Sequence, residues 1–282
     1  MSEKISIYIP VFNAEKTIEQ SVSSVFEQSL KVDEIIVIND NSSDKTEKII
    51  NSFKNIKILK NEKNMGLGYN RNLGIKESRN NIVGSIDADV VLDKFWLENL
   101  MTHLNRNEVV MCGGNLIEKF VNNKYNLWRS NNYSQNWGSN DLLNPPFLYG
   151  CNTLQTKSVW KEVKGYDESM FTNGEDIDYT MKVRSNKNNN LYYSAKSLCY
   201  HLQDDNLQSL SKRVWRYHSF GYKIKKPSIK RLVKLLLKQF KFLFKRIMGD
   251  LFKLKFHFIL IDVMIFVYFI KLEIMRIIKS NN

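Results

Sequence analysis

The first third of the chain alternates short β-branched runs with amphipathic helical patterns, and this alternation restricts the fold more than any other feature. Four runs read as strands, at 5–9, 34–40, 56–59 and 81–87. The second, EIIVIND, is a continuous apolar run of the kind that both faces of a parallel sheet bury. Strands that alternate with helices build a parallel sheet with helices on its faces. The sequence therefore predicts an α/β fold.

The segments between these runs have helical spacing. The first has apolar residues at the i, i+4, i+7 and i+8 positions, which predict one buried stripe formed by Ile18, Val22, Val25 and Phe26. Ser43 or Asp44 can cap a second helix, and a third is expected at 68–78. Further along, residues 121–146 are too polar and aperiodic for a core element and predict a long loop.

Polar segments follow the predicted strands at the points where these strands end. They are IPVFN at 9–13, INDNSSDKT at 38–46, NEKNMGLGYNRNLGI at 61–75 and DAD at 87–89. In open α/β sheets, ligands bind beyond the carboxyl ends of the strands. We therefore expect a binding site where these four segments meet.

Asp87 and Asp89 are the most informative residues of these segments. In an extended chain, positions i and i+2 share a face, so the two carboxylates point into the same space. Like charges at that distance repel unless a cation lies between them, and hard oxygen ligands suit Mg²⁺ or Mn²⁺. The alternative is a solvated Asp-rich turn that closes a strand.

The distribution of charge and the number of cysteines indicate what kind of protein this is and in which compartment it works. Of a net charge of +13, residues 222–282 supply +12, so the remainder is nearly neutral and the basicity belongs to the C-terminal segment. The cysteines, which are Cys112, Cys151 and Cys199, are odd in number and widely spaced, and this fits neither a disulfide framework nor a zinc site. No signal peptide is evident, and a reducing cytosol is the simplest setting.

The C-terminal segment combines lysine with large apolar residues. Lys230, Lys234, Lys238, Lys241 and Lys245 form one basic helical stripe. Such a helix can lie in the headgroup region of an anionic membrane. The apolar run at 258–270 is shorter than a span requires and contains Asp262. We therefore expect an interfacial or shallowly inserted hairpin, with a span across residues 256–275 or a helix packed on the preceding domain as alternatives.

The order and spacing of the strand-end motifs, with a later GED at 174–176, resemble the family-2 glycosyltransferases of GT-A fold. The resemblance covers roughly residues 5–215. It implies a Rossmann-like, mostly parallel sheet with flanking helices, followed by a C-terminal basic and apolar helical tail. We expect a catalytic domain at 1–221 and a membrane-associating region at 222–282, with Pro227 as the best boundary signal.

The resemblance implies that the strand ends bind a nucleotide-sugar donor, with a UDP-sugar favoured. Pro10 and Phe12 would contact the base, Asp40 would accept a hydrogen bond from it, and Arg71 would lie near the nucleotide. For Asp40 the alternative is a cap on the turn that follows it.

Three residues are expected at the metal. Asp89 would ligate Mg²⁺ or Mn²⁺, and Asp87 would lie by the ribose and the metal shell. Similar enzymes often place a metal-ligating histidine where this chain has His201. A structural role for His201 is the alternative.

Two further acids are expected to act on the acceptor. Asp176 matches the family's base, with Glu175 positioning the acceptor or the base, and a single in-line displacement would invert the anomeric configuration. Alternatively, both are first-turn acids that satisfy the helix dipole.

We therefore predict an inverting, metal-dependent glycosyltransferase that modifies a glycan or a polyprenyl-linked saccharide at the cytoplasmic face of the cell membrane. A catalytically inactive family member that acts as a scaffold is one alternative. Nucleic-acid binding through the basic tail is another, and it is disfavoured because the apolar residues between the lysines outnumber what a phosphate-binding arm needs. The expected partners thus include an anionic membrane surface and no nucleic acid.

Overall fold

The computed structural model describes residues 3–104, 106, 108–219 and 229–281. These form two compact units, one of Met1–Lys119 with Gln135–Gln203 and one of Phe120–Ser134 with Asp204–Asn282. The boundary predicted near Pro227 lies outside the described residues.

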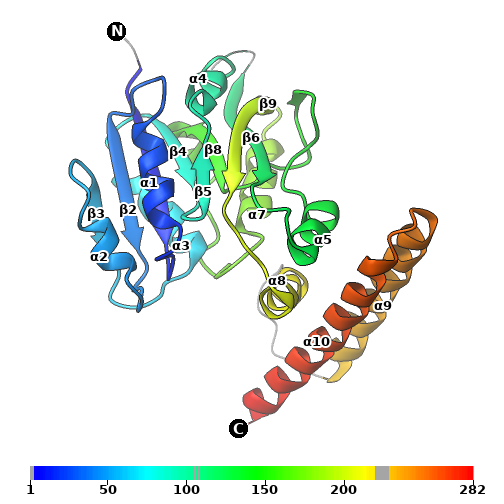
Figure 1. The fold of residues 1–282 in the computed structure, drawn as a ribbon. Helices are drawn as coiled ribbons and strands as arrows, with labels where there is room; N and C mark the ends of the chain where they lie inside the picture. The colour runs from blue at the N-terminus through cyan, green and yellow to red at the C-terminus, as the bar shows by residue number, and fades with distance from the viewer. Residues whose placement is uncertain (1–2, 105, 107, 220–228, 282) are drawn as a thin grey trace. The chain divides into compact units, whose positions relative to one another are not determined.

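The first unit contains one mixed sheet with the strand order β3-β2-β1-β4-β8-β6-β9-β5, and β7 pairs with β9 (Figure 1). Its strands are β1 (Ile5–Val11), β2 (Glu34–Asn39), β3 (Lys57–Lys60), β4 (Ile82–Ile86), β5 (Val90–Leu92), β6 (Val109–Glu118), β7 (Leu142–Leu143), β8 (Asn152–Thr156) and β9 (Asn190–His201). The part built by β3, β2, β1 and β4 is parallel throughout, which confirms the predicted α/β class.

Helices cover both faces of this sheet, because the strands bury apolar side chains on both sides. One apolar cluster joins β1 and β2 to α1 (Ile18–Phe26), α2 (Thr46–Ile50) and α4 (Trp96–Met101). A second cluster joins the opposite face of the same strands to α3 (Leu67–Glu77), α6 (Lys157–Glu162) and α7 (Glu175–Ser185). In this way α3 and α7 reach the sheet from the same side.

Two local predictions were wrong. Phe26 ends α1 with 48% of its surface exposed and stacks on Phe53, so the buried stripe stops at Val25. The segment predicted as a long loop contains α5 (Lys124–Asn132), in which Trp128 is buried. The Asn123 side chain caps this helix by accepting from the N–H groups at 125 and 126.

The second unit consists of α5, α8 (Leu207–Ser219), α9 (Ile229–Phe252) and α10 (Phe256–Asn281). Its core includes Trp128, Leu210, Val214, Phe258, Ile261 and Ile265. Helix α10 packs against α8 and α5, and α9 packs against α10 as a hairpin (Figure 1). No helix in the described part of the chain has the length and apolar content that a bilayer crossing requires.

Asp262 lies within the apolar run of α10 and is accommodated there by an ion pair. Its side chain is fully buried, and Oδ1 accepts from Nε of Arg246 on α9 at 2.6 Å. Burial raises the pKa of Asp262 to about 6, and the Arg246 guanidinium opposes that rise. The pair therefore fixes the register of α9 on α10.

Replacing Asp262 by Ala is expected to destabilise the second unit by about 2 kcal/mol, because it leaves Arg246 partly buried without its carboxylate. The double replacement Arg246→Met with Asp262→Leu should recover most of that loss. Urea unfolding followed by circular dichroism measures both. Equal stability of the single and the double variant would contradict this assignment.

Candidate active site

The turn after β4 places Asp87 and Asp89 at the carboxyl end of the parallel strands. The Asp87 N–H donates to the Cys151 carbonyl at 3.1 Å, and the Asp89 carbonyl accepts from the Leu202 N–H at 2.8 Å. These bonds hold the DAD segment between β8 and the end of β9. Both carboxylates remain partly exposed.

Arg71 on α3 connects the DAD segment to the GED segment. Its guanidinium is buried, and Nη2 donates to Asp87 Oδ1 while Nε donates to Glu175 Oε1, each at 3.0 Å. Nη1 donates to Ser85 Oγ and to the Gly150 carbonyl, each at 2.8 Å. All three guanidinium nitrogens thus have partners, as the burial of a cation requires.

Gly150 permits this close assembly. A Cβ at this position would lie 2.9 Å from the guanidinium carbon of Arg71 and 3.0 Å from Cβ of Asp176. The Gly150 N–H also donates to Asp176 Oδ2 at 3.0 Å. The backbone at Gly150 therefore separates Arg71 from Asp176 and holds both.

Helix α7 begins with the two acids of the GED segment. Gly174 precedes them in the left-handed region with φ 86°, a conformation that suits glycine. Glu175 points inward to Arg71, whereas Asp176 remains partly exposed and Oδ1 accepts from the Ile177 N–H at 2.8 Å. The two neighbouring acids therefore have different environments.

The electrostatics place several carboxylates in one neighbourhood. Burial raises the pKa of Asp87, Arg71 opposes this, and the carboxylates of Asp89 and Asp176 add to the rise. Burial and the adjacent Asp176 also raise the pKa of Glu175 to about 7, again against Arg71. Asp89 and Asp176 come from different segments, and both thus lie near enough to Asp87 to raise its pKa.

His201 ends β9 beside the DAD segment. Its Nε2 lies 3.3 Å from Asp89 Oδ2, and its Nδ1 lies 3.1 Å from both carboxylate oxygens of Glu118. Burial alone would lower the pKa of His201, but the Asp89 and Glu118 carboxylates outweigh it and raise the pKa to about 9. The strand register aligns these residues, because Glu118 on β6 and Val90 on β5 both pair with His201.

The predicted metal ligands are therefore only partly assembled. Asp89 and His201 are in contact, but Asp87 is turned toward Arg71, and no group of three or more His, Cys, Asp or Glu side chains within the described ranges is arranged to hold a metal. A carboxylate oxygen with an imidazole nitrogen nevertheless suits Mn²⁺, and metal-binding histidines usually have a carboxylate such as Glu118 behind them. The residues fit a divalent ion, and the ligand roles stay predictions.

Asp40 is buried and organises the loop that opens α3. It accepts from Asn61 Nδ2 at 2.7 Å and from the Gly66 N–H at 2.9 Å. The turn after β2 is instead held by Asn39, whose Oδ1 accepts from the Ser42 N–H. The base-binding role of Asp40 stays a prediction.

Pro10 and Phe12, which are predicted to contact the base of the donor, lie at the end of β1. Pro10 is buried within the strand, whereas Phe12 follows it with 50% of its surface exposed. An exposed aromatic ring at a strand end is available for contact with a planar base. That contact stays a prediction for both residues.

Sequence reasoning missed Glu118, Ser85 and Gly150. Glu118 ends a strand, but its pairing partner is more than eighty residues away, so no local pattern reports it. Gly150 has no neighbouring glycine, and the need for it comes from Arg71 and Asp176, which lie far from it in the sequence. Only the strand-end position of Ser85, two residues before Asp87, was a usable signal.

Comparison with known proteins identifies a family. The model described as Glycosyl transferase family 2 matches residues 6–164, more than half of the chain. An uncharacterized glycosyltransferase of Haemophilus influenzae is 31% identical over 182 residues, which are 62% of this chain and 56% of that protein. The poly-beta-1,6-N-acetyl-D-glucosamine synthase of Staphylococcus epidermidis is 28% identical over 235 residues, which are 79% of this chain and 55% of that protein. The chain thus spans just over half the length of these relatives.

Solved structures confirm the GT-A type of fold. S. aureus TarS 1-349 in complex with UDP-GlcNAc has a TM-score of 0.58 at 18% identity, covering 76% of this chain and 64% of that one. The mannosyltransferase PcManGT from Pyrobaculum calidifontis, in complex with GDP-Man and Mn²⁺, has a TM-score of 0.60 at 14% identity, covering 78% and 63%. At these identities the likeness concerns the fold alone.

Replacing Arg71 by Met is expected to lower the free energy of unfolding by about 3 kcal/mol, because Asp87 and Glu175 would lose their shared cation while Glu175 stays buried. Arg71→Lys should recover only part of this, since one ammonium cannot make the same bonds. Arg79→Met is the matched control, because the Arg79 side chain is 66% exposed and its loss should cost about 0.5 kcal/mol or less. Urea denaturation provides the comparison, and equal losses for Arg71→Met and Arg79→Met would refute the central role of Arg71.

Proposed function

The chain belongs to glycosyl transferase family 2, and on that premise we propose that it moves a sugar from a nucleotide-sugar donor to a hydroxyl group, with inversion at the anomeric carbon. One observation carries this proposal. Arg71 joins the Asp87 and Glu175 segments, so a donor-facing pair of acids and an acceptor-facing pair surround the same place.

The donor would lie at the carboxyl ends of β1, β2 and β4. A UDP-sugar is the favoured donor, supported by the structural likeness to TarS with UDP-GlcNAc, while the likeness to a GDP-mannose complex makes a GDP-sugar the main competitor. Pro10 and Phe12 would contact the base, and Asp40, which also holds the loop at 61–66, would accept a hydrogen bond from it. In this arrangement, Arg71 orients Asp87 toward the ribose.

Asp89 and His201 would hold Mg²⁺ or Mn²⁺, with Glu118 fixing the imidazole ring of His201. A bound divalent ion at this point supplies positive charge that stabilises the departing nucleoside diphosphate. Asp89 is partly exposed, so phosphate oxygens would be able to reach an ion held by it.

Asp176 is proposed as the base that takes the proton of the acceptor hydroxyl. The Gly150 and Ile177 N–H groups donate to its two oxygens and fix the plane of the carboxylate. Glu175 cannot replace it as the base, because its side chain is buried and held by Arg71. Glu175 instead positions the first turn of α7.

The acceptor is proposed to be a growing cell-surface glycan or a lipid-linked saccharide. The likeness to a poly-beta-1,6-N-acetyl-D-glucosamine synthase supports a polysaccharide product. The first test is a panel of UDP-, GDP- and dTDP-sugars, with release of nucleoside diphosphate as the measured quantity.

With the best donor of that panel, Asp176→Asn is expected to lower kcat by about 10²–10⁴-fold, because the amide cannot accept the acceptor proton. The matched control is Asp178→Asn, which makes the same change two residues later on a side chain paired with Lys182. The control should retain most of the activity. Equal activity of the two variants would remove Asp176 from the mechanism.

Chelation with EDTA is expected to abolish turnover, and added Mn²⁺ or Mg²⁺ should restore it. His201→Gln and Asp89→Ala should weaken Mn²⁺ binding measured directly by electron paramagnetic resonance, about tenfold or more, and Glu118→Gln should have a smaller effect of the same sign. Full turnover in EDTA, or unchanged Mn²⁺ binding by Asp89→Ala, would exclude this metal assignment.

A further inference from the structure

The α9–α10 hairpin buries two of its acidic side chains and half-buries the third. Residues 229–281 contain three acids. Asp262 is paired with Arg246, and Glu273 accepts from Trp215 Nε1 at 3.0 Å. The third, Asp250, has its Oδ2 buried. The hairpin therefore presents little negative charge to solvent.

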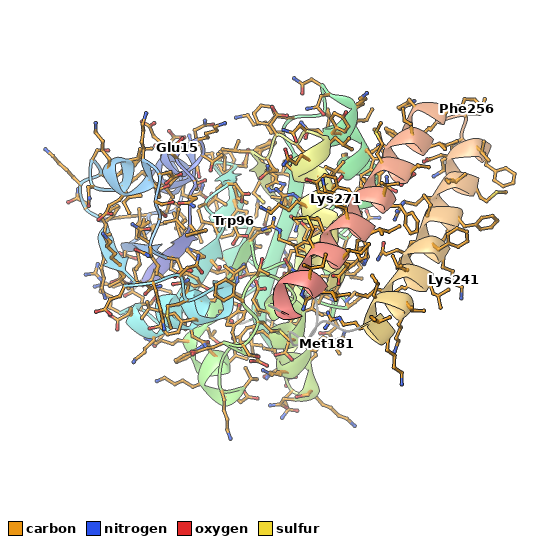
Figure 2. All side chains as sticks on the ribbon, turned by 90° about the horizontal axis from the view of Figure 1, so that it is seen from below. Glu15, Trp96, Met181, Lys241, Phe256 and Lys271 are labelled. Atoms are coloured by element: carbon orange, nitrogen blue, oxygen red, sulfur yellow. The ribbon has the colours of Figure 1, made fainter. Side chains whose placement is uncertain are left out.

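Its basic side chains, in contrast, point outward. The exposed ones are Lys230, Lys234, Lys238, Lys241, Lys245, Lys253 and Lys271. Figure 2 shows Lys241 projecting from the outer side of α9. Because two of the three acids are buried and Asp250 is half-buried, the charge that this surface presents is mostly positive.

A row of exposed apolar side chains runs beside these lysines. On α9 it consists of Val233, Leu237, Phe240 and Phe244, each followed directly by a lysine of the basic stripe. Consecutive helical residues are about 100° apart, so the lysines lie along one border of the apolar row. That arrangement suits a boundary between apolar and aqueous phases, where lysine stems lie along apolar surface and the ammonium groups reach water.

Exposure is greatest at the turn between the helices, the segment FKLKF at 252–256. Phe252 is 83% exposed, Leu254 74% and Phe256 59% (Figure 2 labels Phe256 at this end of the hairpin). Leu254 adopts φ 54°, at a helix-ending position that normally favours glycine. The Lys255 N–H donates to the Asp250 carbonyl at 2.8 Å and closes this turn. The backbone is thus fixed while three large apolar side chains face outward.

We propose that the hairpin docks on an anionic lipid surface, with Phe252, Leu254 and Phe256 entering the acyl boundary and the α9 lysines meeting the headgroups. The sequence alone predicted a basic stripe and an interfacial or shallowly inserted hairpin, whereas the structure assigns the point of insertion to the 252–256 turn. This inference does not depend on the proposed function.

Charge favours this occupant over two others. A second copy of the hairpin would bring two lysine rows together, and like charges oppose such contact. A nucleic acid would meet the lysines but leave the apolar row and the turn in water. Anionic lipid satisfies both features, since it offers negative headgroups above an apolar layer.

The test is flotation of the full chain with phosphatidylcholine vesicles, with and without phosphatidylglycerol. The wild-type chain should float only with the anionic vesicles. The variant Phe252→Ser/Leu254→Asn/Phe256→Ser should bind at least about tenfold more weakly, because it removes the apolar contact. Asn is chosen at 254 because it tolerates positive φ.

The matched control for the triple variant is Phe95→Ser, which removes an exposed phenylalanine from the other unit. Phe95 is 51% exposed and lies beside Lys94.

The lysines are tested separately. Lys241→Glu/Lys245→Glu should also weaken binding at least about tenfold. Lys48→Glu/Lys54→Glu makes the same change in net charge at exposed positions of the first unit and should leave binding unchanged. Circular dichroism verifies that each variant is folded.

Three results would overturn the proposal. The first is equal flotation of the turn variant and the wild-type chain. The second is equal binding to neutral and anionic vesicles. The third is a wild-type dimer that does not float but becomes monomeric in the turn variant, which would make a second copy the occupant.

Discussion

The buried guanidinium of Arg71 is the interaction on which the arrangement of the site depends. It links α3 to the turn after β4 and to the start of α7, three segments separated by up to about a hundred residues in the chain. Burial acts against its positive charge, but Asp87 and Glu175 raise the pKa of Arg71 well above its usual value. A guanidinium suits this place because it offers several donors in one rigid plane and stays charged. A substitution that kept only the charge would lose part of the geometry.

This arrangement divides each pair of acids into an inner and an outer member. Arg71 binds Asp87 and Glu175. Asp89 follows Asp87 by two residues and Asp176 follows Glu175 directly, and the carboxylates of Asp89 and Asp176 are partly exposed. The inner members neutralise a buried cation and fix the backbone. The outer members are held in place by the same backbone. They remain in contact with solvent, and a ligand can replace that solvent. The proposed division of labour, with Asp89 toward the donor and Asp176 toward the acceptor, follows from this difference in pairing with Arg71.

The strands and the clustering of their polar ends were predictable because both depend on local pattern and on the geometry of parallel sheets. The DAD segment could be placed at the site for that reason, whereas the GED segment was placed there through the resemblance to family-2 glycosyltransferases. Glu118 could not, because it meets His201 through the pairing of β6 with β9, a contact between distant segments. Helix α5 escaped prediction because its buried face includes Asn126 and Arg129, which are satisfied by Asp204 and Asp205. Hydrophobic periodicity does not detect a helix that is buried through polar pairs.

The same limit applies to the C-terminal hairpin, where hydropathy alone does not show that a charged residue is buried. Asp262 interrupts the apolar run of α10, yet it is fully buried because Arg246 reaches it from α9. Apolar residues such as Phe258 and Ile261 already pack in the core of the second unit. The hairpin thus has its own internal contacts, and the exposed apolar residues at the 252–256 turn contribute little to them. Their exposure beside lysines is therefore better explained by an external apolar phase with negative charge at its border than by the folding of the unit itself.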